Sequence, residues 1–499
     1  MRKTFDLARQ KRIVDIAFLI CFLLMLVVPV VKMNRAGNQI SEIDNRKLVE
    51  FPAVTIESSF RTEFEAYLTD RIGFRSRMIG AYQKICDVMF RKLKHPIYMY
   101  GEKRYVFFRE GGGYVADYQH LNIDKAYIES CGNYLERLYK YIGDRNIKFI
   151  YFLVPDKKSV YSEFFPRSIN IRGDKSQATM LIDEVKRKKI PYIHPIKVFL
   201  EAKRHEQIYN KKYDAGHWNE HGAFIGHSMI TQMLQEYFSD VNLLAKSDFN
   251  ISMGKVTTLP VSHFEIDEDI PLYQSKNQNT EFIGGYNALF NLDEYQFNLI
   301  QNKSAIWKPK IMVFRDSYFG VIERYYGENF SEIISILSFE NLKNIEYFIN
   351  IFEPDVVLLE SAERVIMPGE LLFSIANMKR TVLHDYSDLS LPSTANKINI
   401  GINPKASGVI VPAAEILSTI TGTAAYLSDG KPGKTLFAKV NGKYYPAKYP
   451  SAEAGKETIF SLTLKADTLR KADKIEFTLI SSDGKFKSQP VAFPLIIEK

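Results

Sequence analysis

Cysteine is scarce in this chain, with only three residues among 499. So few crosslinks cannot hold a chain of this length together, and a disulfide scaffold is therefore excluded. Cys21 lies in an apolar run, whereas Cys86 and Cys131 either form a disulfide or remain buried thiols, and the sequence leaves this open. Blocks of Lys and Arg interleaved with aromatic residues are also missing, although the net charge is +8. This absence argues against nucleic acid as a partner.

Only one long hydrophobic run is present. It covers residues 13–31, IVDIAFLICFLLMLVVPVV, and makes about 28 Å of helix, close to the ~30 Å hydrocarbon core of a bilayer. The basic flank predicts a cytoplasmic tail at 1–12, a single transmembrane anchor at 13–32 and an extracytoplasmic remainder, periplasmic or at the cell surface. A cleaved signal peptide is the rival interpretation, but the following residues offer no convincing Ala-x-Ala site.

The next segment, residues 33–95, is predicted to be helical and close to the membrane. Phe60, Phe64 and Tyr67 share one face of a predicted helix, which is typical of an amphipathic helix that packs on a larger domain. Gly73 interrupts this pattern.

Between residues 96 and 388, short apolar runs alternate with amphipathic segments. The β-prone runs are 147–154, 190–196, 310–314, 333–339 and 355–360. Buried strands that alternate with helices predict an α/β domain with a mostly parallel sheet flanked by helices. In such sheets the ligand site lies at the carboxyl ends of the strands.

After residue 389 helical periodicity fades and short β-prone runs follow one another. Asn-Gly at 441–442 and Asp-Gly at 483–484 are strong hairpin signals. Residues 389–499 are therefore predicted to form a β-sandwich, which is a candidate carbohydrate-binding module. The side chains that would either contact glycan or fill the core of the strands are Tyr444, Tyr445 and Tyr449.

A candidate nucleophile lies in KPKIMVFRDSYFGVIERYY, residues 308–326. The predicted strand ends at Phe314, and Ser317 falls where a following helix would begin. Backbone N–H groups and the positive helix end would stabilise negative charge beside the Ser317 oxygen. Asp316 and Ser317 are equally ordinary helix N-cap residues, so the window by itself leaves both interpretations open.

The stretch YDAGHWNEHG, residues 213–222, has three interpretations. Asp214 can accept a hydrogen bond from one imidazole nitrogen of His217, which leaves the other nitrogen free to take a serine proton. The pair can also merely hold a polar turn. A metal site would use His221 as well, but the order departs from His-Glu-x-x-His and no further neutral ligand is nearby. No metal site is therefore predicted, and His221 is expected to be structural.

Taken in order, these motifs resemble the alginate O-acetyltransferase family. The Asp/His loop precedes FRDSYF by about 100 residues, and VPDKKSVYSEFFP (154–166), PDVVLLESAER (354–364), DNRKLVEFP and DRIGFR accompany them. The resemblance covers about residues 40–370 and implies an SGNH-hydrolase-like catalytic domain. In that family the serine is the nucleophile, so the resemblance makes Ser317 the nucleophile, His217 the general base and Asp214 the residue that orients it. This chain has Asp-x-x-His where the family often has Asp-x-His.

Other residues are candidates for binding the oxyanion or the substrate. An oxyanion hole needs two or three donors. The Ser317 backbone N–H is one, and Gly284, Gly285 and Asn287 are further candidates, although a plain Gly-Gly turn explains them as well. Arg315 either binds substrate or holds a loop carboxylate. The resemblance also suggests that Tyr161, Glu360 and Arg364 support the site, and packing or a salt bridge explains them equally.

The resemblance implies an O-acetyltransferase that acts on an exopolysaccharide or a cell-envelope glycan through a serine acetyl-enzyme, without a cofactor. Because acetyl-coenzyme A is absent outside the membrane, a polytopic membrane-bound O-acyltransferase is the expected acetyl donor. Two alternatives remain open. The same residues would serve a glycan acetyl esterase, because water exclusion and acceptor placement decide between transfer and hydrolysis. The second alternative is a non-catalytic polysaccharide-binding scaffold of an export complex.

Overall fold

The chain is described by a computed structural model over most of its length. The described residues are 2–35, 40–41, 46–52, 60–95, 97–109, 114–121, 124–260, 264–276, 280–284, 297–320, 323–337, 339–369, 371–381, 398–403, 408–411, 417–426, 433–447, 458–481 and 487–497. The expected turn at 483–484 and Tyr449 lie outside them.

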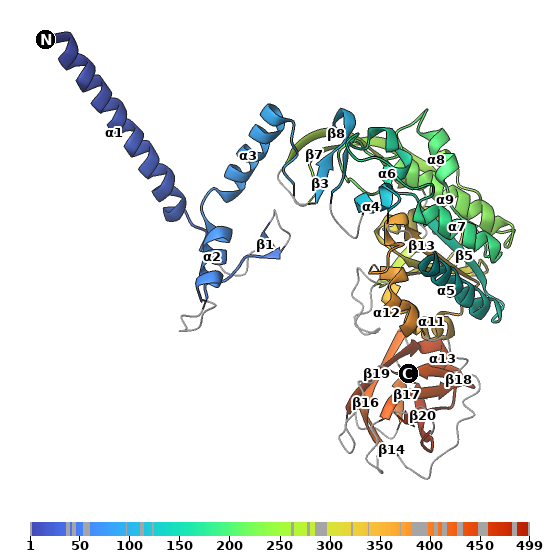
Figure 1. Ribbon diagram of the computed structural model, residues 1–499. Helices are drawn as coiled ribbons and strands as arrows, with labels where there is room; N and C mark the ends of the chain where they lie inside the picture. The colour runs from blue at the N-terminus through green and yellow to red at the C-terminus, as the bar shows by residue number, and fades with distance from the viewer. Residues whose placement is uncertain are drawn as a thin grey trace.

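A long N-terminal helix stands apart from the body of the molecule (Figure 1). This helix, α1 (Arg2–Val31), contains an apolar span from Arg12 to Val31 that is long enough to cross a membrane. Two short paired strands, β1 (Ile40–Ser41) and β2 (Arg46–Lys47), precede α2 (Phe60–Arg71) and α3 (Arg75–Phe90). The span agrees with the predicted membrane anchor.

The turn between α2 and α3 packs against the end of α1. Gly73 N donates to the Pro29 carbonyl at 2.8 Å, and Asn34 N donates to the Arg71 carbonyl at 2.8 Å. A Cβ atom at Gly73 would lie 2.7 Å from the Lys32 carbonyl oxygen, so only glycine permits this contact. The helical pattern is interrupted at Gly73, as the sequence indicates.

A seven-stranded sheet forms the centre of the predicted α/β domain of residues 96–388, called the catalytic-type domain after the predicted function, in the order β6-β5-β13-β11-β12-β10-β9. Five strands are parallel, and β10 and β9 are antiparallel additions at one edge. The strands are β5 (Lys148–Val154), β6 (Tyr192–Ile193), β9 (Thr280–Gly284), β10 (Phe297–Asn302), β11 (Lys310–Arg315), β12 (Glu332–Leu337) and β13 (Val356–Ala362). The predicted mostly parallel sheet is confirmed.

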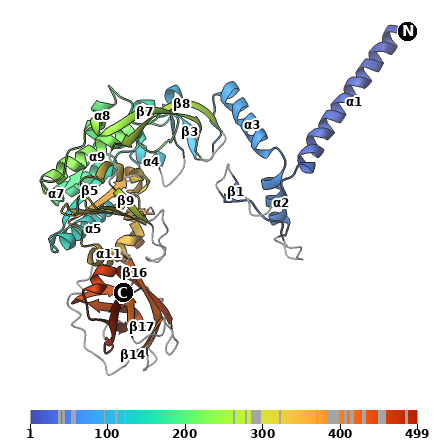
Figure 2. The same ribbon diagram turned by 180° about the vertical axis from the view of Figure 1, so that it is seen from behind.

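Helices cover both faces of this sheet (Figures 1 and 2). In β5, Phe149 and Tyr151 point to one face, and Ile150 and Phe152 point to the other. The first face packs against α5 (Lys125–Gly143), α7 (Gln177–Arg187), α11 (Ile345–Phe352) and α12 (Ile375–Arg380). The second packs against α8 (Ile196–Ala202) and α9 (Glu220–Gln235). Burial on both faces explains why these strands are continuous apolar runs.

A long antiparallel hairpin reaches from this domain toward α3 (Figure 1). It consists of β7 (Phe249–Thr258) and β8 (Glu265–Ser275), and the shorter pair β3 (Tyr98–Tyr100) and β4 (Val106–Phe108) lies nearby. Most residues of β7 are exposed, so the strand carries no apolar run. For that reason the sequence analysis did not predict the hairpin.

The C-terminal region consists of two antiparallel-rich sheets, in agreement with the predicted β-sandwich. One sheet is β14-β16-β19 and the other is β15-β21-β20-β17-β18. Their strands are β14 (Ile398–Asn403), β15 (Val409–Val411), β16 (Leu417–Tyr426), β17 (Gly433–Val440), β18 (Lys443–Pro446), β19 (Thr458–Lys465), β20 (Lys474–Ser481) and β21 (Val491–Ile497). Asn441 and Gly442, with φ of 49° and 82°, form the tight turn between β17 and β18.

The sandwich and the catalytic-type domain share one continuous apolar core. Helix α11 lies between the two domains, where the Tyr347 hydroxyl donates to the Thr463 carbonyl at 2.6 Å. Lys465 Nζ lies 2.7 Å from Glu332 Oε2 across the same boundary. Tyr445 is buried here at 1% exposure, so it fills the core.

The sequence left open whether Cys86 and Cys131 form a disulfide, and the structure shows that they do not. Cys86 in α3 and Cys131 in α5 are both free and buried.

Candidate active site

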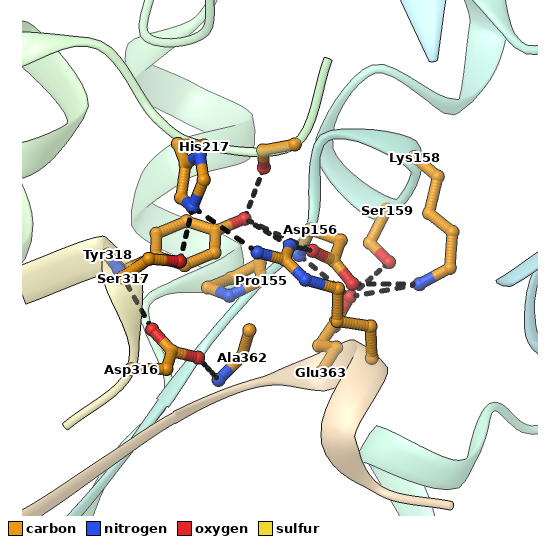
Figure 3. A network of polar contacts seen from close by, with 12 residues as sticks. Pro155, Asp156, Lys158, Ser159, His217, Asp316, Ser317, Tyr318, Ala362 and Glu363 are labelled. Carbon is orange, nitrogen blue, oxygen red and sulfur yellow. Dashed lines mark hydrogen bonds and ion pairs between the residues drawn. The ribbon is translucent and has the colours of Figure 1, made fainter. Parts of the chain in front are cut away.

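Ser317 lies directly after the central strand β11, at the carboxyl edge of the sheet. It is exposed, whereas Asp316 before it and Tyr318 after it are buried. Asp316 determines this geometry: Oδ1 accepts from Tyr318 N at 2.8 Å, and Oδ2 accepts from Ala362 N at 2.9 Å (Figure 3). The carboxylate thus joins the ends of β11 and β13 and presents the Ser317 hydroxyl to solvent.

Two expectations around Ser317 are corrected. Ser317 does not begin a regular helix: it opens a 3-10 turn, Ser317–Phe319, and the next described helix, α10, is short and runs from Glu323 to Tyr326. A three-residue turn has little dipole, although its backbone N–H groups remain available. Arg315 is 2% exposed, and its guanidinium donates to Ser335 Oγ at 2.6 Å and to the Asp316 carbonyl at 3.2 Å. Arg315 therefore supports the turn from within the protein, and the structure does not place it in the site.

Asp214 and His217 lie on the loop between α8 and α9. Asp214 has φ of 52°, a left-handed conformation that Asp tolerates better than most residues. Its Oδ1 accepts from the backbone N–H groups of Gly216 at 3.3 Å and His217 at 3.2 Å. The loop is fixed on one side by Trp218, which packs on Phe152 and Tyr318.

The other side of this loop is fixed by Glu268 of β8. Its carboxylate accepts from the backbone N–H groups of Lys211 at 2.5 Å, Lys212 at 2.8 Å and Tyr213 at 2.6 Å. The hairpin that the sequence analysis missed thus holds the chain immediately before Asp214.

The structure brings Ser317, His217 and Asp214 into one hydrogen-bonded chain. His217 Nδ1 lies 2.7 Å from Asp214 Oδ2 and 2.8 Å from Oδ1, and His217 Nε2 lies 2.7 Å from Ser317 Oγ (Figure 3 shows the latter contact). Burial would raise the pKa of Asp214, but hydrogen bonds from His217 and its charge outweigh this and lower the pKa to about 2. Asp214 is therefore ionised and holds Nδ1 protonated, so Nε2 is an acceptor for the Ser317 hydroxyl.

A buried charge network lies beside this chain, at the ends of β5 and β13 (Figure 3). Asp156 is fully buried and pairs with Arg364. The Tyr318 hydroxyl lies 3.1 Å from Asp156 Oδ1 and also contacts the Gly216 carbonyl. Burial disfavours ionisation of Asp156, but Arg364 and Lys158 lower its pKa below the usual range. Arg364 Nη2 also lies 3.5 Å from His217 Nε2, so a fixed positive charge stands next to the imidazole.

Lys158 binds the carboxylates of this network. Its ammonium lies 2.7 Å from Asp117, 3.3 Å from Asp156 and 3.7 Å from Glu363. Burial opposes the charged form, but these carboxylates raise the pKa of Lys158. Buried charges that are paired in this way are costly to separate, so the network is a rigid support.

A cavity of about 300 Å³ opens at Ser317 and His217. Ile270, Pro271 and Leu272 of β8 contribute apolar side chains to its lining. Asn210 also lines it; this side chain is 5% exposed, and its Oδ1 has no hydrogen-bond partner among the described residues. Asn210 is not predictable from the sequence, because nothing local distinguishes it from other polar loop residues.

The remaining candidates have different outcomes. Gly285 and Asn287 lie outside the described residues. Tyr161 is a correction: it is 4% exposed, its hydroxyl accepts from Ile208 N at 3.2 Å, and it packs in an aromatic cluster with Tyr105 and Tyr209 away from the cavity.

Glu360 and His221 both have structural partners. Glu360 Oε2 accepts from Asp316 N at 2.8 Å, and burial together with Asp316 raises the pKa of Glu360. His221 Nδ1 lies 2.9 Å from the Tyr273 hydroxyl and 3.0 Å from Glu206, so it is held apart from His217.

Comparison with known proteins agrees with the fold. Residues 100–260 match the family model of the SGNH hydrolase-like domain of the acetyltransferase AlgX. This match confirms the resemblance to the alginate O-acetyltransferase family and the SGNH-like α/β domain. A search of curated protein sequences gives no match.

Solved structures give distant matches. PatB1 of Bacillus cereus matches at 15% identity and a TM-score of 0.42, covering 53% of this chain and 96% of that one. The O-acetyltransferase domain of Pseudomonas putida AlgJ matches at 13% identity and 0.39, covering 58% and 100%. AlgX of Pseudomonas aeruginosa matches at 11% identity and 0.38, covering 73% and 85%. All three TM-scores are below 0.5, and a match at that level does not establish a function.

Proposed function

We propose that this chain is an O-acetyltransferase that moves an acetyl group to a hydroxyl of an exopolysaccharide or cell-envelope glycan through an acetylated Ser317. One observation carries the proposal: His217 links the ionised Asp214 to an exposed serine hydroxyl at 2.7 Å, at the carboxyl edge of the sheet. The AlgX-type match over residues 100–260 supports the same class of reaction.

In the first half-reaction, Ser317 Oγ attacks the carbonyl carbon of an acetyl donor. His217 Nε2 takes the hydroxyl proton, and Asp214 stabilises the imidazolium that forms. The tetrahedral intermediate then collapses, the bond to the donor's leaving group breaks, and His217 returns the proton to that group. The product is an acetyl ester of Ser317.

In the second half-reaction, a sugar hydroxyl enters beside the ester. His217 Nε2 takes its proton while the sugar oxygen attacks the acetyl carbon. Collapse breaks the ester bond, and Ser317 Oγ recovers the proton from His217. One acetyl group has moved, and the enzyme has returned to its starting state.

Negative charge on the tetrahedral oxygen needs donors that are already in place. The backbone N–H of Ser317 is one such donor in this proposal. Arg364 supplies fixed positive charge next to His217, and its pairing with Asp156 prevents the guanidinium from moving away. The Asn210 amide is a candidate contact for the donor or the acceptor, because it is buried at the same cavity.

The proposed topology places the basic N-terminus in the cytoplasm and the catalytic domain outside. The apolar span of α1 supports a single anchor, and the positive residues before it favour this direction. In this topology the acetyl group must cross the membrane, and we propose a polytopic membrane-bound O-acyltransferase as the donor partner and the polysaccharide as the acceptor.

Intact-mass analysis of the purified full chain tests the reaction directly. After mixing with p-nitrophenyl acetate, we expect one added acetyl group on Ser317, lost faster when acetyl-free oligosaccharides are present than in buffer. Peptide mapping locates the group, and acetylated sugar is measured in the same sample.

The matched variants are Ser317→Ala, which should take no acetyl group, and Ser247→Ala, an exposed serine elsewhere that should behave like the natural chain. Loss of the group to water at a rate that no sugar changes would identify an esterase. No adduct on a folded chain would reject both enzymes and favour the scaffold.

A further inference from the structure

Helix α3 carries an exposed apolar stripe next to the proposed membrane anchor. Met78, Tyr82, Ile85 and Met89 are 44%, 54%, 51% and 70% exposed. Their spacing of four, three and four residues places them on one face of the helix. Val88 lies beside this face and is also exposed. We call these five residues the α3 stripe. Side chains of this kind are rarely left in water as a continuous row unless something covers them.

The opposite face of α3 already packs on the protein. Gln83 and Cys86 are each 6% exposed, and Gln83 Nε2 donates to the Lys94 carbonyl at 3.0 Å. Asp87 accepts from the Tyr100 hydroxyl at 3.1 Å. The catalytic-type domain is therefore attached to one side of the helix, and the α3 stripe points away from that attachment.

Basic residues border the α3 stripe. Arg77 and Lys84 lie along the margin next to the β7–β8 hairpin, where they line a cavity with Glu265, and Arg75 lies along the other margin, as follows from 100° of rotation per residue. Lys84 also forms an exposed ion pair with Glu265 at 3.5 Å. Asp87 is the only acidic residue in the helix sequence, and it lies on the packed side. The outward face thus combines aliphatic side chains with a positive margin, the composition of a helix that lies in a membrane interface.

The position of α3 brings this face to the end of the apolar span. The α2–α3 turn is bonded to α1 through Gly73 N and the Pro29 carbonyl, and through Asn34 N and the Arg71 carbonyl. In both views α3 turns aside from the line of α1 instead of continuing it (Figures 1 and 2). A helix that leaves a membrane span in this manner stays near the bilayer surface.

We propose that α3 lies on the outer leaflet with the α3 stripe in the headgroup and acyl boundary and the arginine side chains at its margins near anionic lipid phosphates. The inference rests on the topology of the proposed function. Long cationic side chains extend their charged ends to the headgroups while their stems cover apolar surface. With one face in lipid and the other bonded to Tyr100 and Lys94, α3 fixes the height and orientation of the catalytic domain above the membrane.

Depth-dependent quenching of the full chain in nanodiscs tests this placement. The discs contain phosphatidylglycerol and phosphatidylethanolamine with brominated acyl chains, and bimane is attached to Met89→Cys in a Cys21→Ser background. Cys86 and Cys131 are buried, which keeps the labelling selective. The matched control is Ile306→Cys, a 78% exposed position in the catalytic-type domain. We expect bimane at 89 to lose most of its fluorescence and bimane at 306 to lose none.

Native Cys21, labelled in the unaltered chain, reports on the anchor separately. Quenching at 21 without quenching at 89 would overturn the placement of α3 and leave the anchor standing. No quenching at 21 would reject the anchor and the inference together, whereas acetyl transfer by Ser317 is measured independently. A further outcome would also overturn the lipid assignment. If brominated lipid does not quench bimane at 89, but native membranes protect this label from quenching by iodide, a protein partner covers the α3 stripe.

A lipid exchange tests the positive margin. Replacing phosphatidylglycerol with phosphatidylcholine is expected to weaken quenching at 89, because anionic phosphates attract the basic residues. Equal quenching in both lipids would overturn the pairing of these residues with anionic headgroups.

Discussion

At the scale of single residues, Asn210 is a buried amide that lines the Ser317 cavity. Its Oδ1 lacks a partner among the described residues although the side chain is buried at the Ser317 cavity. A buried polar group without a partner costs about 1–3 kcal/mol, and a ligand hydroxyl or amide would recover that energy. We expect Asn210→Ala to lower kcat/KM about tenfold, mainly through KM, with the thermal midpoint unchanged or raised. A change in kcat alone, or none at all, would contradict contact with the substrate.

Two histidines four residues apart offer a matched comparison. His217 contacts Ser317 Oγ, whereas His221 is held by Tyr273 and Glu206. His217→Ala is expected to reduce kcat by about a thousandfold or more, as loss of a general base does. His221→Ala should keep kcat and lose only stability. Hydrolysis of p-nitrophenyl acetate measures kcat of both variants. Equal losses of kcat would instead indicate a metal site that the two histidines share.

His227 predicts how stability depends on pH. It is 1% exposed, and burial lowers its pKa from 6.5 to about 3. The unfolded chain takes up this proton near pH 6.5 and the folded chain does not, so acid favours unfolding. The stabilising contribution is complete above about pH 6.5 and is lost as pH falls toward 3, by about 2 kcal/mol at pH 5. In His227→Gln the thermal midpoint should fall less between pH 8 and pH 5; an unchanged pH slope would refute the assignment.

At the scale of elements, the ends of β11 and β13 are tied together by carboxylates at both edges of the sheet. Asp316 accepts from Ala362 N near the site, and Asp355 accepts from Lys310 N at 2.7 Å at the far edge. Asp316→Ala is expected to lower stability by about 2 kcal/mol, because buried N–H groups lose their acceptor, and also to lower kcat by displacing Ser317. Asp355→Ala should lower stability with kcat intact, so parallel effects in the two variants would contradict a positioning role for Asp316.

The elements that the sequence predicts well are those buried on both sides. The runs at 147–154 and 310–314 correspond to β5 and β11, because a strand covered by helices is apolar throughout. The run at 190–196 contains only a two-residue strand, since Pro195 starts the next helix. The hairpin β7–β8 escaped prediction because most of β7 faces solvent and because β8 buries only a few scattered residues, so neither strand is a continuous apolar run.

The residues of the site also differ in how well the sequence predicts them. Asp214 and His217 are recognisable because only two residues separate them in sequence and their contact is local. Asn210 and Arg364 reach the cavity or the imidazole only through the tertiary fold, so neither spacing nor composition assigns their contacts. For Tyr161 the resemblance suggested support of the site and left packing as an equal explanation, and the structure shows the packing.

At the scale of the whole molecule, the sandwich is packed onto the catalytic-type domain as part of one core. Tyr347 donates to the Thr463 carbonyl, Asn350 Nδ2 donates to the Tyr444 carbonyl at 2.9 Å, and Lys443 pairs with Glu353. The two domains are therefore expected to move and unfold as a unit, unlike modules joined by a flexible linker.

Calorimetry of the full chain tests this coupling. We expect one cooperative unfolding transition for the two domains, and Tyr347→Phe should lower stability by about 1 kcal/mol through the lost hydrogen bond. Tyr237→Phe, at an exposed surface position, is the matched control and should change nothing. Two separate transitions would show that the shared core does not couple the domains.

The strand order determines when the site can form during synthesis. β13 pairs with β5 on one side and β11 on the other, yet it follows both in the chain. Until the residues of β13 are in place, β5 and β11 keep open edges that invite pairing with the wrong chain. The tie from Asp316 to Ala362 is equally absent. Ser317 therefore gains its support only when β13, the last central strand of the sheet, is inserted.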